Sequence, residues 1–322
     1  MREKIMKILK SSSGYVSGEA ISNQLGVSRA AIWKHIKALR EDGYEIESVT
    51  NKGYRLINSP DRLTAAELSD GLCTSFVGQH AVFFEETDST NIRAKHSSEQ
   101  PDGTVFITER QTGGKGRLGR AWFGPPGVGV WMSLLLKPSL PPEDVPQVTL
   151  IAGLAVCRAV RTVSRLPAMI KWPNDVIVNG KKICGILTEL SAEMEQVNFI
   201  VCGIGINVNT EAFDGELSKK ATSLLMESGT PQNRKAIAQA VLTEFESLYQ
   251  LFLKEGFSSL LSEYKSFCAT LNKDVTISRA GKEESARAVD IDSFGCLVIE
   301  QNGVRTSIQS GEVSVRGIYG YA

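Results

Sequence analysis

The spacing of apolar residues at the start of the chain predicts three short helices followed by a β-hairpin. The positions that share a helix face are Ile5, Ile8 and Leu9 in the first helix, Ala20, Ile21 and Leu25 in the second, and Ile32, Ile36 and Leu39 in the third. Gly26 is placed to end the second helix, and Ser28 is placed to cap the third. Strand-like runs at 44–49 and 54–57 flank an Asn-Lys-Gly turn. We therefore expect a winged helix-turn-helix over residues 1–58.

Strand-like and helical segments alternate from a Ser-Pro-Asp linker at 59–61 to about residue 265. The expected strands are 81–85, 104–109, 128–136, 168–172, 176–178, 182–190 and 199–208, and the expected helices are 91–96, 145–163 and 234–254. An Asn179-Gly180 turn joins two of these strands as a hairpin. A strand-rich segment, 274–316, follows. The pattern predicts an α+β multidomain protein.

Composition and charge narrow the class of protein. No apolar run approaches the roughly 18 residues of a membrane span, and the charged start, MREKIMKILK, lacks the apolar core of an export signal. The six cysteines are widely spaced, which favours reduced thiols over disulfides or a metal site. Net charge is zero, yet the first 60 residues hold ten basic and six acidic side chains. We expect a cytoplasmic protein with no membrane partner, whose N-terminal unit alone meets a polyanion.

The third helix of this unit has the character of a DNA-reading helix. Its outward residues and the hairpin tip supply the candidate DNA contacts, which are Ser28, Arg29, Trp33, Lys34, Lys37, Arg40 and Lys52. Arg55, on the second strand of the hairpin, is a further candidate. A solvated charged face on a small helical bundle is the alternative, since such faces are common on any helix.

A glycine-rich run at 111–120, QTGGKGRLGR, contains a formal G-x-G-x-x-G pattern after a strand. The dinucleotide interpretation fails because Ala-Trp-Phe-Gly-Pro-Pro-Gly follows, and this segment cannot open a helix. Lys115, Arg117 and Arg120 instead combine cations with a backbone that can approach phosphate oxygens. A mobile basic surface loop is the alternative.

Four further polar segments are candidates for chemistry. They are Thr87-Asp-Ser-Thr-Asn91, Lys171-Trp-Pro-Asn-Asp175, the strand that begins Lys181-Lys182-Ile-Cys-Gly, and Gly203-Ile-Gly-Ile-Asn207. Taken singly, the first is ordinarily a helix cap and the second a capped turn. The two glycines of the last segment would admit a ligand close to the backbone.

Together and in this order, DSTN, GGKGRLGRAW, KWPND, KKICGIL and GIGIN resemble the catalytic domain of biotin protein ligases. With the winged helix in front, the chain is similar to the bifunctional form that also represses biotin genes. The resemblance implies three domains. They are a winged helix-turn-helix at 1–60, a class II synthetase-like mixed sheet with helices at 61–270, and an SH3-like small β-barrel at 271–322.

The resemblance also implies the reaction and its residues. Such enzymes make biotinyl-5′-AMP from biotin and ATP with Mg²⁺, and then pass biotin to a lysine of a biotin carboxyl carrier protein domain. The implied biotin-binding residues are Ser89, Thr90, Asn91, Gln111, Lys115, Gly116, Arg117 and Lys182. Trp122 and Trp131 are candidates to cover the thiophane ring and valeryl chain, and ordinary packing in the core is the alternative for both. The implied ATP or adenylate residues are Lys115, Arg117, Arg120, Lys182 and Asn207. Arg117 and Lys182 would be catalytic, Asp175 would contact the acceptor lysine, and no residue is assigned as a metal ligand apart from Asn207 near the nucleotide or its magnesium ion.

The implied partners are the carrier domain, operator DNA and a second copy of the chain, because the family dimerises through its central sheet. Phe213 is the one aromatic residue between Asn207 and Met226, where the family folds a loop over adenine. Two alternatives remain open at this stage. They are a small-molecule-sensing repressor without ligase activity and a lipoate-type ligase.

Overall fold

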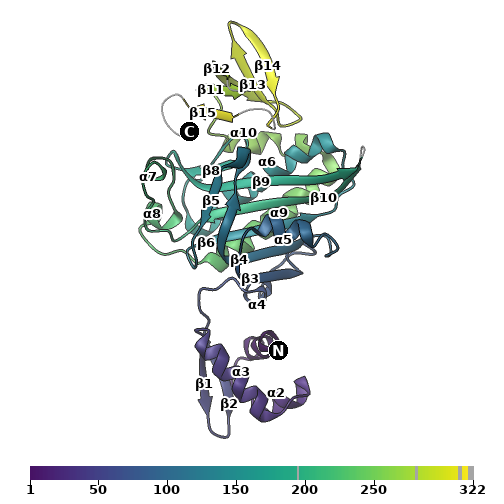
Figure 1. The fold of residues 1–322 in the computed structure, drawn as a ribbon, viewed down its shortest axis with the longest axis vertical. Helices are drawn as coiled ribbons and strands as arrows, with labels where there is room; N and C mark the ends of the chain where they lie inside the picture. The colour runs from purple at the N-terminus through teal and green to yellow at the C-terminus, as the bar shows by residue number, and fades with distance from the viewer. Residues whose placement is uncertain (194–195, 280–281, 311–313, 318–322) are drawn as a thin grey trace.

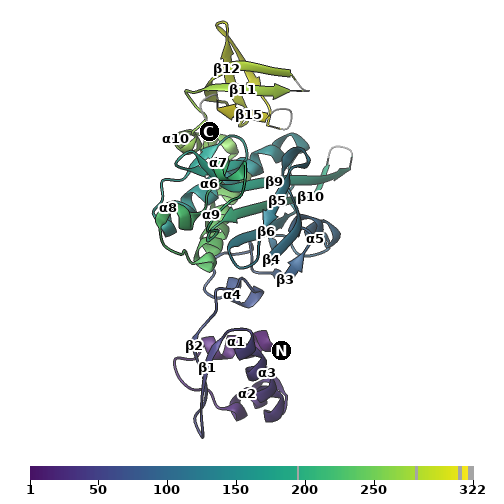
Figure 2. The same cartoon turned by 60° about the vertical axis from the view of Figure 1, so that its left-hand side comes forward.

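The computed structural model describes residues 1–193, 196–279, 282–310 and 314–317 of the 322-residue chain. Its strands form a two-stranded, an eight-stranded and a five-stranded sheet in chain order. Figures 1 and 2 show an elongated molecule with the helical unit at one end and the five-stranded sheet at the other. The predicted α+β class and mixed central sheet are confirmed.

The N-terminal unit has its own core and follows the predicted pattern. Its elements are α1 (Arg2–Lys10), α2 (Gly18–Leu25), α3 (Arg29–Glu41), β1 (Glu45–Val49) and β2 (Gly53–Asn58). The predicted apolar faces, Ile5 and Leu9 among them, are buried together. Ser28 caps α3 by accepting a hydrogen bond from the amide of Ala31, and Gly26 ends α2 in the left-handed conformation at φ +66°.

The central sheet has the strand order β3-β4-β6-β10-β9-β8-β7, with β5 paired to β4. Its strands are β3 (Ala81–Thr87), β4 (Thr104–Lys115), β5 (Ala121–Gly124), β6 (Gly129–Leu136), β7 (Met169–Lys171), β8 (Asp175–Val178), β9 (Lys181–Glu193) and β10 (Gln196–Asn207). Strands β3 and β4 are parallel, and the other pairs are antiparallel. The predicted Asn179-Gly180 turn has positive φ at both residues, as a tight hairpin requires.

The two faces of this sheet are covered differently. Helices α6 (Val145–Ser164) and α9 (Arg234–Glu255) pack on one face and bury the main core. The short helix α5 (Thr90–His96) and strand β5 lie on the other face (Figure 1). The remaining short helices are α4 (Ala65–Ser69), α7 (Leu217–Lys220), α8 (Leu224–Ser228) and α10 (Leu261–Phe267). A segment that includes α6 is apolar and long enough to cross a membrane, but 67% of its window is buried, as in a core helix.

The C-terminal sheet is antiparallel and packs against the central unit. Its strands are β11 (Asp274–Arg279), β12 (Lys282–Ile291), β13 (Leu297–Gln301), β14 (Val304–Ile308) and β15 (Ser314–Gly317). The indole of Trp172 donates a hydrogen bond to the carbonyl of Gly295 at 3.0 Å. Lys265 pairs with Asp290 at 2.6 Å. The C-terminal unit is thereby held beside the Lys171–Asp175 turn.

The glycine-rich run differs from the expected loop. Strand β4 continues to Lys115 and pairs with β5, so only residues 116–120 form the tip of a hairpin. A glycine is needed at position 114, because a Cβ there would lie 2.5 Å from the carbonyl oxygen of Trp122. The expected strand end at residue 109 was wrong, since glycines that discourage a strand locally also permit this close pairing.

Candidate functional site

Three glycines form a side-chain-free strip on the sheet face that carries α5 and β5. Gly203 and Gly205 alternate along β10, and Gly185 is the cross-strand neighbour of Gly205 on β9. A Cβ on Gly203 would lie 2.1 Å from Asn91, and one on Gly205 or Gly185 would lie 2.6 or 2.8 Å from the Trp122 ring. Only glycine permits these approaches, so the strip is a floor on which α5 and β5 rest.

A buried polar cluster lies at the Gly203 end of the strip. The backbone amide and hydroxyl of Thr90 donate to Oε1 of Gln111 at 3.0 and 3.2 Å. The hydroxyl of Ser133 lies 2.7 Å from Oγ1 of Thr90 and 2.6 Å from Oδ1 of Asn91. The structure thus brings together residues from two sequence motifs. Ser133 was missed, although it alternates with Trp131 on β6 and therefore shares its face.

Ser89 lies immediately before α5, and it is buried. Its side chain makes no capping hydrogen bond to the helix, so the ordinary explanation for a serine at this position does not apply. Its amide instead donates to the carboxylate of Asp88 at 2.7 Å, and this bond is the main reason that the pKa of Asp88 is lowered. Ser89 therefore belongs to the polar cluster by position.

Trp122 and Trp131 differ in position. The Trp122 ring rests on the glycine strip and meets Trp131 edge-on, with ring centroids 6.2 Å apart. Trp131 is only 1% exposed and donates its indole N–H to the carbonyl of Pro125. This burial is what the core alternative expects of Trp131, and its contact with a ligand stays a prediction.

A charged cluster lies at the other end of the strip. Nζ of Lys182 lies 2.6 Å from the carboxylate of Asp175 and 5.2 Å from the centre of the Trp122 ring. The guanidinium of Arg117 donates to the side-chain oxygen of Asn174 at 3.2 Å and to the carbonyl of Ser310. Burial lowers the pKa of Arg117, and Asp175 partly offsets this effect. Three separate sequence motifs therefore converge here.

The other predicted cations and Asn207 are placed differently. Lys115 and Arg120 are exposed on the β4–β5 hairpin, and Gly116 joins its tip by donating to the Arg120 carbonyl at 2.7 Å. Asn207 is buried at the end of β10 and donates to the carbonyl of Thr222. This bond gives Asn207 a structural task in holding the segment that precedes α8. Among the residues that the structure describes, no group of three His, Cys, Asp or Glu side chains could hold a metal.

The predicted DNA face of α3 is exposed, but one of its cations, Arg40, is hydrogen-bonded within the protein. Trp33 is 59% exposed, and Arg29, Lys34 and Lys37 lie on the same solvent-facing side. Arg40, in contrast, donates to the carbonyl of Ile46 at 2.9 and 2.6 Å and to the hydroxyl of Ser48 at 2.5 Å. Its guanidinium therefore joins α3 to the hairpin. The periodicity of the helix alone does not reveal this role.

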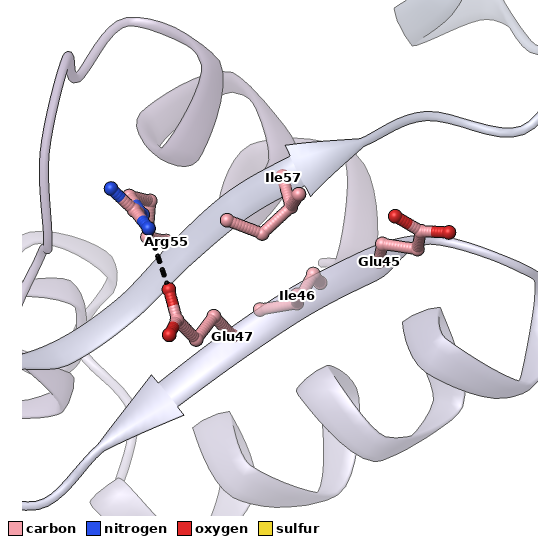
Figure 3. Close-up of a pocket in the computed structure, with 5 residues that line it drawn as sticks. All are labelled: Glu45, Ile46, Glu47, Arg55 and Ile57. Carbon is pink, nitrogen blue, oxygen red and sulfur yellow. Dashed lines mark hydrogen bonds and ion pairs between the residues drawn. The ribbon is translucent and has the colours of Figure 1, made fainter.

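The hairpin carries a surface hollow of about 410 Å³, shown in Figure 3. Two of its charged lining residues pair with each other, because Arg55 lies 2.7 Å from the carboxylate of Glu47. Tyr15 donates to the same carboxylate, and Lys52 at the hairpin tip lies 5.8 Å from the Tyr15 ring centre. We read this hollow as part of the hairpin surface and not as the ligand site.

Ion pairs connect the N-terminal unit to the central unit. Lys10 of α1 pairs with Glu67 at 2.6 Å and with Asp70 at 3.0 Å, and Lys235 of α9 pairs with the same two carboxylates. A cleft of about 710 Å³ lies beside them at the junction. The adjacent Arg234 is fully buried and pairs with Glu109 of β4 and Asp61 of the linker. The winged unit is thus anchored to the helix that covers the central core.

Comparison with known protein families gives a match in each of the three parts of the chain. The Biotin/lipoate A/B protein ligase family matches residues 83–207. An HTH domain matches residues 1–55, and the Biotin protein ligase C terminal domain matches residues 270–316.

Relatives share this organisation. The chain is 38% identical over 305 residues to Bifunctional ligase/repressor BirA of Bacillus subtilis, covering 94% of each chain. It is 31% identical to Bifunctional ligase/repressor BirA of Escherichia coli, covering 93% of this chain and 92% of the relative. The solved Biotin protein ligase from Aquifex aeolicus in complex with biotin and ATP has a TM-score of 0.66 at 30% identity, covering 74% of this chain and 99% of that chain.

Proposed function

The chain belongs to the biotin protein ligase family, and we propose that it joins biotin to ATP and transfers biotin to a lysine of a biotin carboxyl carrier protein domain. One observation carries the proposal for this site. A buried polar cluster and a charged cluster lie at opposite ends of the glycine strip, as a ligand with a polar ring and a carboxylate tail requires.

We assign the ureido ring of biotin to the polar cluster and its carboxylate to the charged cluster. Ser89, Thr90, Asn91 and Gln111 offer donors and acceptors to the urea, and a site built for such pairing rejects analogues that leave its groups unmatched. Trp122 would cover the apolar part of the ligand, since it already packs on Gly185 and Gly205.

Adenylation joins the biotin carboxylate to the α-phosphorus of ATP, and the bond to the departing pyrophosphate breaks. Both reactants are anionic, so cations that hold them together and neutralise the transferring phosphoryl group lower the barrier. Arg117 and Lys182 fill this role, with Lys115, Gly116 and Arg120 closing over the adenylate from the hairpin tip. A covalent protein nucleophile is not required.

In the second step, the carrier lysine attacks the acyl carbon of biotinyl-5′-AMP and AMP departs. The attacking amine must lose a proton, and Asp175 at the rim of the charged cluster can receive it or orient the amine. Its pairing with Lys182 at 2.6 Å keeps this carboxylate within the site.

Mg²⁺ would enter with ATP and neutralise its phosphates. This ion usually keeps several waters and binds through substrate phosphates with one or two carboxylates, so it does not need a cage of protein ligands. The donor set fits this mode, with Asn207 at the end of β10 as the residue assigned nearest to the nucleotide or its ion.

We further propose that the chain is a cytoplasmic, biotin-responsive repressor that binds operator DNA as a homodimer. The HTH domain and the exposed basic face of α3 support DNA binding. Two winged units in one dimer would read a palindromic site. Domain limits of 1–60, 61–270 and 271–322 are proposed as the functional units.

Incubation with labelled biotin, ATP and a carrier domain tests the ligase. We expect label on one carrier lysine and pyrophosphate release only when biotin is present. Operator binding without label transfer would favour a repressor that lacks ligase activity. Transfer of lipoate in preference to biotin would favour a lipoate-type ligase.

A further inference from the structure

We propose that Glu189 is a specificity-determining positioning residue, which fixes the Asn91 amide so that its oxygen faces the ligand as a hydrogen-bond acceptor. This inference rests on the proposed function and concerns the polar end of the same site. By this role, Glu189 favours ligands that present an N–H group to Asn91.

The partners of Asn91 determine the orientation of its amide. Nδ2 lies 2.8 Å from Oε2 of Glu189 and 3.2 Å from the carbonyl oxygen of Leu187. Both partners can only accept, so the NH₂ group must face them and both of its protons are used. The amide oxygen must then point the other way, toward Ser133 and over Gly203.

The neighbouring hydroxyl leaves acceptor capacity at this oxygen. Ser133 has one proton to donate, and it lies within hydrogen-bond distance of both Thr90 and Asn91. A carbonyl oxygen has two lone pairs, so Oδ1 of Asn91 can accept from Ser133 and from a ligand at once. Asn91 therefore offers the ligand an acceptor and has no donor left for it.

The carboxylate at position 189 is the closer of the two acceptors that fix this orientation. Its other oxygen lies 2.5 Å from Nζ of Lys95, so the ion pair anchors the side chain from α5. A glutamine in its place carries both a donor and an acceptor, so only the Leu187 carbonyl, at 3.2 Å, would still select the orientation of the Asn91 amide. The negative charge also polarises the amide through its N–H group, which strengthens the acceptor on the far side.

The alternation of residues along β9 identifies Glu189 as a residue of the site face. Gly185, Leu187 and Glu189 alternate along β9, so a residue two steps beyond a floor position returns to the same face. The cross-strand neighbours of these three residues on β10 are Gly205, Gly203 and Val201, in that order. Glu189 thus reaches the site from a strand whose motif appeared to end at Leu187.

The test compares Glu189→Gln with the unmodified protein in biotin-dependent pyrophosphate release. We expect KM for biotin to rise about 10- to 100-fold, the range for loss of one oriented buried hydrogen bond, with KM for ATP unchanged. The unmodified protein should discriminate strongly against biotin methylated on a ureido nitrogen, tested at each nitrogen in turn. Glu189→Gln should reduce that discrimination, because only the Leu187 carbonyl then holds the Asn91 amide in place.

Glu193→Gln is the matched control, since this glutamate lies on the same strand and is exposed. It should leave both KM values and the discrimination unchanged. Lys95→Met changes only the outer anchor at a partly exposed position, and it should raise KM for biotin about 2- to 5-fold. This variant carries the test should Glu189→Gln fail to fold.

An unchanged KM for biotin and unchanged discrimination in a folded Glu189→Gln protein would overturn the assignment and leave the ligase intact. Equal rises in KM for biotin and for ATP would also overturn it, because they indicate general damage. Failure of the unmodified protein to release pyrophosphate in response to biotin would overturn the proposed function itself.

Discussion

Replacing Lys182 by methionine should slow biotin adenylation by about two to three orders of magnitude without unfolding the protein. The Lys182 side chain is 21% exposed, and its ammonium lies 2.6 Å from Asp175 and 5.2 Å from the centre of the Trp122 ring, so it is held in a partly desolvated position. Two unit charges about 4 Å apart attract by about 4 kcal/mol at an effective dielectric constant of ~20. Removal of one such contact in a transition state costs about 10²- to 10³-fold in rate. Methionine keeps an apolar stem against Trp122.

Lys181→Met is the matched control, because its ammonium lies 3.5 Å from the carbonyl of Ser218, away from the glycine strip. Both variants should unfold near the temperature of the unmodified protein in a thermal melt. Single-turnover pyrophosphate release then reports the chemical step. A Lys182→Met rate within about threefold of the control, equivalent to less than ~0.7 kcal/mol, would refute the electrostatic reasoning.

Four further results are expected. Gly205→Ala would place a Cβ 2.6 Å from Trp122, so calorimetry should show biotin affinity reduced by about 1–3 kcal/mol while operator binding by the apo protein persists. Lys34→Ala should lower the slope of log operator affinity against log salt concentration by about 1, and its melting temperature should stay unchanged. Arg40→Ala should instead lower the free energy of unfolding of the winged unit by ~1 kcal/mol, because its hydrogen bonds to the hairpin are lost. Burial, together with the neighbouring carboxylate of Glu67, raises the pKa of Tyr44 to about 12. The contribution of the neutral Tyr44 hydroxyl to the free energy of unfolding is therefore complete below about pH 10 and is lost as pH rises through about 12. Tyr44→Phe should remove that alkaline loss in a pH series of thermal melts.

Elements with a strong local pattern were predictable from the sequence. Helix α9 begins at Arg234 and ends at Glu255, within one residue of the expected 234–254, because its apolar stripe repeats at one spacing throughout. The hairpin at Asn179-Gly180 was predictable because those residues adopt positive φ with little strain. The three helices of the winged unit follow the same logic of apolar faces and caps.

The pairing of distant segments was not predictable in this way. The extension of β4 to Lys115 depends on contact with β5, and the strand order across the sheet joins segments far apart in the chain. Arg40 presents a cation on the outer face of a helix, and only the position of β1 directs it to a carbonyl. Tertiary contacts override local propensity in such cases.

The site residues also include some that the sequence predicted and some that it did not. Motif resemblance identified Thr90, Asn91 and Gln111, and the structure brings them into one hydrogen-bonded cluster. Ser133 was missed because it stands alone in an apolar strand, and Glu189 was missed because it lies beyond the KKICGIL motif on its strand. Strand alternation alone would have placed both on the site face once a single neighbour on each strand was assigned to it.

A crystal structure with biotinyl-5′-AMP tests the central claim most directly. The account predicts the ureido ring within hydrogen-bond distance of Asn91 and Gln111, the apolar chain against the side of Trp122 that faces away from the glycine strip, and the phosphate within reach of Arg117 and Lys182. Density for the ligand at the junction cleft beside Lys10 and Lys235, or with its ureido ring at the charged cluster, would contradict it.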